Sequence, residues 1–352
     1  MKKKPTISDI AKLANVSIAT VSRVLSNSDY PVKEEVRQKI LGISKEVNYK
    51  PNIFGKMLKG GSSKEIGVII PSVTNPFYAQ LVSAVEKQCI NRGYIPLICS
   101  SYNNPKMEKR HIDILFQKQV AGIVMSTIRK DDPFLNIEAH DKNVKVVLFD
   151  QTRTDLQYDS VSFDFRKGGY MAVDYLIQCG HKDIAFLTAP IDRKSRKMIL
   201  EGYKQALKIN GIMYNSKRVI ISSMIGTNDS GEFEYENGKT LARLLLQDKV
   251  LPDAIVTIND MTAIGIIREL TSEGIEVPKD VSIIGFDNIS ISSMITPSLT
   301  TINQPSYETG TLATKMLLDR IEGKEIETNN IVMKPTLIKR DSVKKIEKET
   351  RQ

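Results

Sequence analysis

Residues 15–27, NVSIATVSRVLSN, place small hydroxyl and apolar side chains at the start of a short helical pattern and one arginine near its end. If Val21, Val24 and Leu25 face a core, the opposite face is exposed. Hydroxyls and helix-start amides bind phosphates, arginine reaches guanine or phosphate, and small apolar groups contact a thymine methyl. An amphipathic core helix is the plain alternative, which an exposed isoleucine beside an arginine disfavours. We predict that DNA is contacted by Thr6, Ser17, Ile18, Ala19, Thr20, Ser22, Arg23 and Asn27.

The residues around this segment are patterned as helices that would hold it in place. Thr6 and Asp9 are spaced as in a capping box, and apolar residues then recur at helical spacing. Asn15 tolerates the left-handed backbone of a tight turn. A further helical pattern begins after Pro31 and runs to Val47. Three short helices with a turn between the first two predict a helix-turn-helix, whose second helix enters the major groove.

The positive charge of the chain is concentrated in the same region. Of 352 residues with a net charge of +9, the first 60 carry twelve Lys or Arg against five Asp or Glu. The remaining 292 residues carry 38 against 36, so a basic module precedes a nearly neutral body. A solvated basic tail is the alternative, but such tails lack helical patterning. The distribution favours a nucleic-acid partner.

The segment TISDIAKLANVSIATVSRVL, residues 6–25, resembles the N-terminal signature of the lactose-repressor (LacI/GalR) family of bacterial transcription regulators. A second segment, NYKPNIFGKML at residues 48–58, is similar to the hinge helix of that family. The resemblance implies a hinge that orders on operator DNA, pairs with its dimer mate in the minor groove and inserts a leucine. It implies DNA contacts for Asn52, Lys56, Leu58 and Lys59, with Leu58 as the wedge.

The hinge segment also has features of its own. Pro51 suits a first helical turn and Asn52 can cap it, while the apolar side chains that follow are unusual for an exposed linker. Gly55 stands where the family usually has alanine. Since glycine costs a helix about 0.5–1 kcal/mol, this hinge is expected to be harder to fold.

The body alternates strand-like and helix-like runs, which predicts parallel sheets flanked by helices in two lobes. The strand-like runs are Ile66–Ile70, Ile95–Cys99, Gly122–Met125, Val144–Phe149, Ile184–Leu187, Val219–Ser222, Ala254–Ile258 and Ile283–Phe286. The resemblance implies a body like a periplasmic sugar-binding protein, with crossings between lobes near residues 162, 290 and 323.

We therefore expect an α/β fold with an all-α headpiece. Its parts are a helix-turn-helix domain at 1–50, a hinge helix and linker at 51–63, an effector-binding and dimerisation domain at 64–340, and a basic polar tail at 341–352. The N-lobe would comprise about 64–162 and 291–323, and the C-lobe about 163–290 and 324–340. The tail lacks leucine heptads, so nothing in it predicts a tetramer-forming coiled coil.

Loops at the carboxyl ends of the strands are the expected ligand site. Carboxylates and amides around aromatic rings suit a hydroxyl-rich ligand, although strand-end Asp and Asn residues also serve as helix caps. The expected ligand contacts are Asn75, Phe77, Tyr78, Asp150, Asn259 and Asp287. Ile199 stands where the family commonly has a ligand-binding arginine, and Arg193 and Ser195 could substitute. Residues 299–305 match another family stretch, expected to be structural.

Other functional classes fit the sequence poorly. It contains no GxGxxG, P-loop, HExxH or GxSxG motif, and its three histidines and three cysteines show no metal-ligand spacing. We expect no enzyme activity, cofactor or metal, and a reducing, cytoplasmic compartment without membrane attachment. The expected partners are palindromic operator DNA, a second copy of the chain and a small effector, a sugar or related metabolite. Two alternatives stay open: a catabolite-control-type regulator with a phosphorylated carrier protein as corepressor, and a sugar-binding protein.

Overall fold

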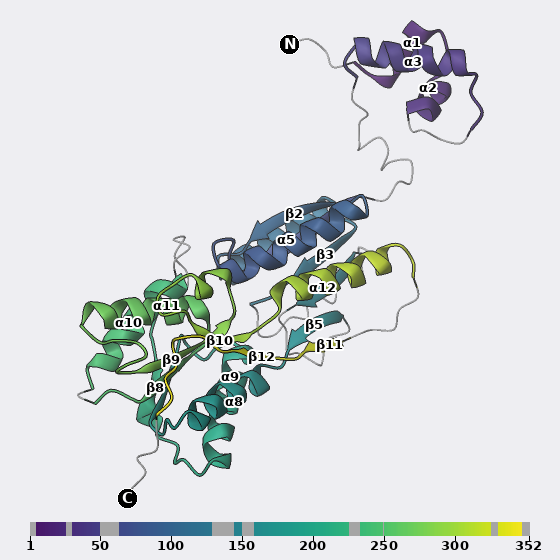
Figure 1. Cartoon of the computed structure of the whole chain (residues 1–352). Helices are drawn as coiled ribbons and strands as arrows, with labels where there is room; N and C mark the ends of the chain where they lie inside the picture. The colour runs from purple at the N-terminus through teal and green to yellow at the C-terminus, as the bar shows by residue number, and fades with distance from the viewer. Residues whose placement is uncertain are drawn as a thin grey trace, which may run out of the picture. The chain divides into compact units, whose positions relative to one another are not determined.

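The computed structural model describes residues 5–25, 30–49, 63–128, 144–149, 158–224, 233–248, 250–324 and 330–346 (Figure 1). The chain divides into two compact units, Met1–Ser63 and Lys64–Gln352. Each unit has a hydrophobic core of its own.

The first unit contains three helices, α1 (Ile7–Ala14), α2 (Ile18–Leu25) and α3 (Glu34–Glu46). Thr6 and Asp9 form a complete capping box at the start of α1, and Asn15 closes this helix with a left-handed φ of 56°. The apolar stripes of the helices meet in one small core, so the helical periodicity of the sequence is accounted for. This core consists of Ile10, Ala11, Ala14, Val21, Val24 and Ile40.

The second unit contains two six-stranded sheets. The first has the order β11-β5-β4-β3-β1-β2 and is parallel throughout. Its strands are β1 (Glu65–Ile70), β2 (Ile95–Ser100), β3 (Gly122–Met125), β4 (Lys145–Phe149), β5 (Asp159–Phe163) and β11 (Asn330–Met333). Helices α5 (Pro76–Asn91) and α12 (Ser306–Ile321) lie side by side on one face (Figure 1), and α6 (Pro105–Gln117) covers the other.

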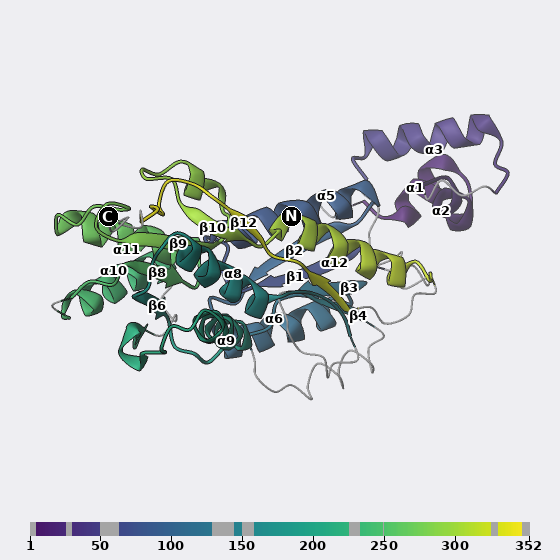
Figure 2. The ribbon, with the colours of Figure 1, turned by 60° about the horizontal axis from the view of Figure 1, so that its bottom comes forward.

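The second sheet has the order β12-β10-β9-β8-β6-β7, with only β12 antiparallel to its neighbour. Its strands are β6 (Ile184–Thr188), β7 (Val219–Ile221), β8 (Ala254–Thr257), β9 (Ser282–Asp287), β10 (Thr300–Asn303) and β12 (Thr336–Ile338). Helices α8 (Phe165–Gln178) and α9 (Lys194–Ile209) pack on one face, and α10 (Phe233–Leu246) and α11 (Asp260–Ser272) on the other (Figure 2). Two 3-10 turns, η1 (Ser216–Arg218) and η2 (Ser290–Ser293), complete the described elements.

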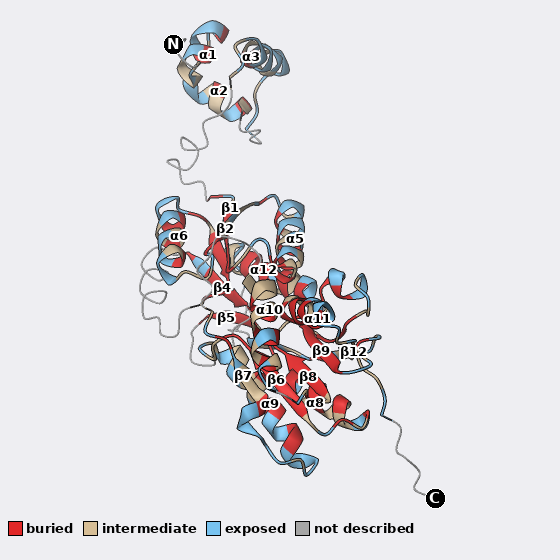
Figure 3. Ribbon diagram, turned by 90° about the vertical axis from the view of Figure 1, so that its left-hand side faces the viewer, coloured by how far each residue is buried: buried red, intermediate tan, exposed pale blue. Residues whose placement is uncertain are grey.

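Buried residues concentrate on the central strands of both sheets (Figure 3). Five of the six residues of β1 are buried, as are all residues of β6 and β8. Helices on both faces require such near-continuous apolar strands. The parallel α/β architecture expected from the alternating pattern is therefore confirmed.

The chain crosses between the two sheets three times: between β5 and α8, between β10 and α12, and between β11 and β12. The first crossing agrees with the expected position near residue 162. The crossings expected near 290 and 323 were placed too early, because β10 still pairs with β9 in the second sheet and β11 with β5 in the first. These strands are only four residues long, and TTIN carries no strand-like apolar run.

The residues after β12 pack against the second lobe. Ser342 is fully buried and its hydroxyl donates to the Ile283 carbonyl at 2.6 Å. The Ile346 amide donates to the Cys179 carbonyl at 2.8 Å. Residues 341–346, expected to begin a polar tail, are thus an integral part of this lobe. Within the described ranges, no helix has the length and apolarity needed to cross a bilayer.

Candidate functional site

The exposed face of α2 carries the side chains expected to read DNA. Val21 and Val24 are buried, whereas Ala19 and Arg23 are exposed and Ile18 keeps 48 % of its surface accessible. A 48 % exposed isoleucine beside an arginine contradicts a helix that serves only the core. The Arg23 guanidinium lies 3.8 Å from the centroid of the Tyr30 ring.

The hydroxyl residues near α2 also hold the local structure. The Thr6 hydroxyl donates to Asp9 Oδ2 at 2.7 Å, and the Thr20 amide donates to Ser17 Oγ at 3.1 Å. Ser22 is half-buried. The predicted contacts Asn27, Asn52, Lys56, Leu58 and Lys59, and the departure at Gly55, lie outside the described residues.

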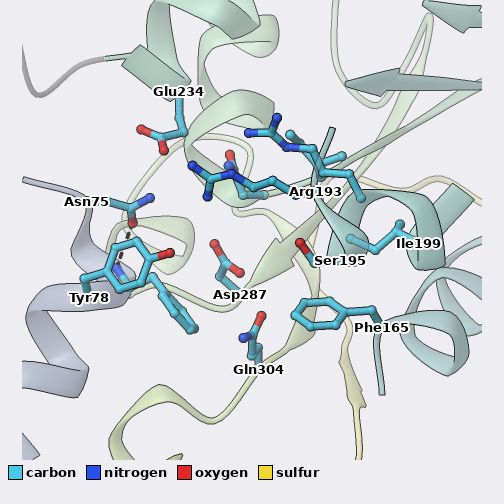
Figure 4. Close-up of a pocket in the computed structure, with 13 residues that line it drawn as sticks. Asn75, Tyr78, Phe165, Arg193, Ser195, Ile199, Glu234, Asp287 and Gln304 are labelled. Atoms are coloured by element: carbon cyan, nitrogen blue, oxygen red, sulfur yellow. Dashed lines mark hydrogen bonds between the residues drawn. The ribbon is translucent and has the colours of Figure 1, made fainter. Parts of the chain in front are cut away.

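The second unit contains a cavity lined by side chains from both lobes (Figure 4). Its volume of about 70 Å³ is several times what one water molecule requires. Asn75 and Tyr78 lie on one side, and Ser195, Ile199 and Phe165 on the other (Figure 4). The lining consists of Asn75, Phe77, Tyr78, Phe165, Arg193, Ser195, Arg196, Ile199, Glu234, Ile258, Asn259, Asp287 and Gln304.

Two of the polar groups in this cavity are helix caps as well. Asn75 Oδ1 accepts a hydrogen bond from the Phe77 amide at 3.0 Å, at the start of α5. Asn259 Oδ1 accepts from the Thr262 amide at 2.8 Å, at the start of α11. The cap function fixes these two side chains at the carboxyl ends of β1 and β8. Capping and lining the cavity are therefore compatible.

Asp287 ends β9 with an unusual backbone conformation. Its φ is 110°, in a region that residues other than glycine rarely adopt. The Asp287 carbonyl accepts a hydrogen bond from the amide of Gln304, the residue that follows β10, at 3.3 Å. Strain of this kind concentrates where a side chain is positioned for function. Both Asp287 and Gln304 line the cavity.

The start of α9 supplies two arginines to the cavity. Arg193, Arg196 and Ile199 are spaced by three, so they share one face of the helix. Arg193 donates a hydrogen bond to Asn103 Oδ1 of the other lobe. Arg196 donates to the Pro190 carbonyl at 2.7 Å and to Asp192 at 3.1 Å. Burial lowers the pKa of Arg196 to about 10, and the charge of Arg193 acts in the same direction.

Close helix packing fixes the position of α9. A Cβ added to Gly202 would lie 2.1 Å from the Arg166 carbonyl oxygen of α8, and one added to Gly169 would lie 2.3 Å from the Ile199 carbonyl oxygen. Glycine at both positions lets the two backbones meet. The contact lies within one turn of the side chains that α9 contributes to the cavity.

A buried carboxyl group ties the segment after Asp287 to α11. Asp260 is fully buried and accepts hydrogen bonds from the Ser292 hydroxyl at 2.6 Å, the Thr301 hydroxyl at 2.5 Å and the Ile289 amide at 3.0 Å. Burial raises the pKa of Asp260 to about 6, although these hydrogen bonds and the charge of Arg340 oppose the increase.

The cavity brings together most of the residues that the sequence predicted as ligand contacts. Asn75, Phe77, Tyr78, Arg193, Ser195, Asn259 and Asp287 all line it. Asp150 lies outside the described residues.

Sequence reasoning missed other lining residues. Arg196 could have been found, because it lies three residues after Arg193 in a helical pattern. Gln304 belongs to the stretch expected to be only structural, and nothing in the sequence around Glu234 indicates its position. The missed residues are Phe165, Arg196, Ile258, Glu234 and Gln304, together with Ile199, which was noted only for lacking a charge.

The lining is suited to binding a small polar molecule. Aromatic and aliphatic walls surround a few convergent carboxylates, amides and guanidiniums, as in sites for small polar molecules. Within the described part of the chain, no group of three or more His, Cys, Asp or Glu side chains is arranged to hold a metal.

Comparison with known proteins covers both units. Residues 6–52 match the model "Bacterial regulatory proteins, lacI family", and residues 173–343 match "Periplasmic binding protein-like domain". The ribose operon repressor of Escherichia coli (strain K12) is 34 % identical over 337 residues, which is 96 % of this chain and 99 % of that protein. The transcriptional repressor PurR of Histophilus somni (strain 129Pt) is 34 % identical over 340 residues, again 96 % and 99 %. Both relatives are named as repressors, not as enzymes.

Solved structures extend the likeness to three dimensions. A lac repressor dimer bound to operator and an anti-inducer superimposes with a TM-score of 0.83 at 26 % identity, covering 97 % of this chain and all of that one. A LacI-family regulator from Enterococcus faecium with bound ribose gives 0.71 at 28 % identity over 80 % of this chain and all of that one. With a helix-turn-helix headpiece, a two-lobed body and these relatives over nearly its whole length, the chain belongs to the LacI family of bacterial regulatory proteins and is a DNA-binding transcriptional repressor.

Proposed function

We propose that this repressor binds a palindromic operator as a dimer and is switched by a small molecule in the cavity between its lobes. The observation that carries the proposal is one cavity lined from both lobes. A ligand held by both lobes has a different affinity for each lobe arrangement, and any such difference shifts the equilibrium between arrangements. We propose that the cavity binds its ligand without converting it chemically. We also propose that the protein acts in the cytoplasm.

At the DNA end, the exposed face of α2 would enter the major groove. Arg23 would supply a base contact, Ile18 and Ala19 an apolar surface for a thymine methyl, and Ser17, Thr20 and Ser22 contacts to phosphates. The lac repressor structure that this chain resembles is described as a dimer bound to operator. That description supports one headpiece per half-site here. The limits 1–50 for the headpiece and 51–63 for the hinge and linker belong to this proposal, whereas the body extends beyond the expected limit of 340 because residues 341–346 pack against its second lobe.

A second copy would cover the exposed edge of the first sheet. Strand β2 is an edge strand, and Ile95 and Ile98 on it are 58 % and 46 % exposed. An apolar edge strand left open invites uncontrolled pairing, so soluble proteins cover such edges. We propose that the dimer mate does so. Ile95→Lys together with Ile98→Lys should yield monomers in sedimentation velocity, while a chain that stays dimeric would refute this interface.

The relatives support a sugar or related metabolite as the ligand. One is named for the ribose operon, and one solved neighbour holds ribose. Asp287, Asn259, Gln304 and Asn75 could each hold hydroxyl groups, while Phe165 and Phe77 supply apolar walls.

Thermal-shift screening of the full chain against sugars, sugar acids, sugar phosphates and nucleosides would identify the ligand, and operator titrations with and without each hit would test the switch. Asp287→Ala should abolish the effect of the ligand on operator affinity but leave the affinity without ligand unchanged. Asp287→Asn serves as the matched control, because it removes only the charge. If Asp287→Ala responds to ligand like the unmodified chain, Asp287 has no role in the switch.

A further inference from the structure

The two arginines at the start of α9 give one end of the cavity a distinctive charge. Arg193 and Arg196 lie on the same helix face, and both line the cavity. Among the described residues, no carboxylate forms an ion pair with Arg193; its hydrogen-bond acceptor is the neutral Asn103. The one carboxylate paired with Arg196 is Asp192, whose side chain is 53 % exposed. Among the described residues, no carboxylate that lines the cavity is ion-paired with either guanidinium, although the charge of Glu234 raises the pKa of Arg196.

Two carboxylates, Glu234 and Asp287, also line the cavity. Neither Glu234 nor Asp287 forms an ion pair with Arg193 or Arg196 in the part of the chain that the structure describes. Asp287 ends a strand and Glu234 begins α10, so both come from elements other than α9. Acceptors on these elements suit the hydroxyl groups of a ligand, whereas the start of α9 presents two guanidinium donors and the Ser195 hydroxyl.

Ser195 and the helix itself add to the donor character of this end. Ser195 lies between the two arginines in sequence and lines the cavity with them. The N-cap position of α9 makes no side-chain hydrogen bond to the first turn, and that turn contains no acidic residue. Other helices around the cavity, α5 and α11, are capped by asparagines. A helix start without a side-chain cap or an acidic residue, together with two guanidiniums, favours an anion.

The arginines stand at the start of α9, before Ile199. Ile199 occupies the helix position where the family resemblance places an arginine, and it is 2 % exposed. Arg196 lies one turn earlier, so the cation is displaced by about 4.5 Å along the helix. A ligand that reaches it must extend further toward the start of α9.

We propose that the cavity binds a hydroxyl-bearing anion, a sugar acid or a sugar phosphate, whose acidic group lies among Arg193, Arg196 and Ser195. The inference rests on the proposed effector site and specifies the class of its ligand. A carboxylate and a phosphate share the chemistry that bidentate guanidinium groups recognise. The hydroxyl groups of the ligand would face Asp287 and Gln304, and its carbon skeleton Phe165.

The test compares matched neutral and acidic probes on the full chain at constant ionic strength. Thermal shifts are measured with ribose, ribose 5-phosphate and ribonate, with glucose, glucose 6-phosphate and gluconate, and with orthophosphate alone. The acidic probes should raise Tm at concentrations where the neutral sugars do not. Comparison of the sugar phosphates with the sugar acids shows whether the site prefers a phosphate or a carboxylate. Neutral sugars that stabilise as strongly as their acids, or a series in which neither the acids nor orthophosphate stabilise, would overturn the inference.

Variants assign the effect to the cavity. Arg193→Gln should weaken binding of the acid at least tenfold. Lys197→Gln removes an exposed charge from the same helix and should leave binding unchanged. Equal losses for Arg193→Gln and Lys197→Gln would indicate a general charge effect and refute the site.

Operator titrations with the same probes separate this inference from the proposed function. If a neutral sugar binds and changes operator affinity, the effector proposal holds and the anion inference fails. If an acid binds through Arg193 without changing operator affinity, the anion site holds and the proposed switch fails.

Discussion

The guanidinium of Arg23 stacks 3.8 Å from the centroid of the Tyr30 ring, which joins the exposed face of α2 to the connection leading into α3. Both side chains are exposed. A stacked cation of this kind gains about 0.5–1 kcal/mol at an exposed site. The ring therefore restricts the conformations of the arginine before DNA is present. This reduces the conformational entropy that the Arg23 side chain loses when it binds DNA.

Arg23→Ala should weaken binding to the operator by about 1–3 kcal/mol and change binding to scrambled DNA much less. Tyr30→Ala should cost operator affinity about 0.5–1 kcal/mol, because the arginine loses its stacking partner. Tyr30→Phe keeps the ring and serves as the control. Anisotropy titrations at fixed salt measure all three variants. Equal losses on both DNAs would identify Arg23 as a phosphate contact.

The hydrogen bond from Arg193 to Asn103 links the two lobes beside the cavity. Asn103 has a φ of 55°, so Asn103→Gly removes the side chain without backbone strain. We expect this variant to exchange amide hydrogens faster near residues 101–104 and 193–196, because a charge-assisted hydrogen bond between the two lobes is lost. Asn103→Asp keeps an acceptor and should remain protected. Unchanged exchange in Asn103→Gly would show that the bond does not hold the lobes.

The parts of the molecule that were predictable from sequence are those fixed by local interactions. Thr6, Asp9 and Asn15 cap and close a helix within a few residues of one another, and long apolar runs specify the central strands. Strands β5 (DSVSF) and β10 (TTIN) escaped prediction because polar residues interrupt their apolar ones. Strands β11 and β12, of four and three residues, were missed too, and their partners lie far away in the chain.

The cavity was predictable only in part, for a related reason. Asn75, Asn259 and Asp287 follow apolar strands, so their positions at the strand ends could be inferred. Glu234 and Gln304 reach the same cavity only through the arrangement of the lobes. No local sequence pattern predicts how the two lobes are arranged. The burial of Asp260 likewise depends on Ser292 and Thr301, which are 32 and 41 residues away in sequence.

Gly202→Ala should destabilise the second unit, because the added methyl group would lie 2.1 Å from the Arg166 carbonyl oxygen. Forcing α8 and α9 apart is expected to cost about 1–3 kcal/mol or more, seen as a lower Tm. Gly42→Ala is the matched control, since nothing lies within 4 Å of its added Cβ and it stands inside α3. That control should be neutral or stabilise the headpiece by up to about 1 kcal/mol. A Gly202→Ala chain with unchanged Tm would show that the helices can separate freely.

Asp260 should make the stability of the body depend on pH in a specific direction. Burial raises its pKa to about 6, well above that of an exposed aspartate. Between the unfolded and folded pKa values the native state binds more protons than the unfolded chain. The contribution of Asp260 to stability is therefore fully present below about pH 4 and is lost as the pH rises through about 6.

Asp260→Asn removes this titration while keeping the shape of the side chain. The free energies of unfolding of the unmodified chain and the variant, measured from about pH 4 to pH 7.5, are subtracted so that the titrations of all other groups cancel. The unmodified chain should lose roughly 2–3 kcal/mol relative to Asp260→Asn across this interval. A difference that stays constant across this pH range would show that Asp260 titrates normally, and such an offset would reflect altered hydrogen bonds alone. Thr301→Val gives a second measure, because it removes a hydroxyl that donates to the carboxylate at 2.5 Å. Losing that donor disfavours the ionised form, so the pH at which stability falls should move upward. A shift in the opposite direction would mean that Thr301 stabilises the protonated acid, and that the burial argument for Asp260 is wrong.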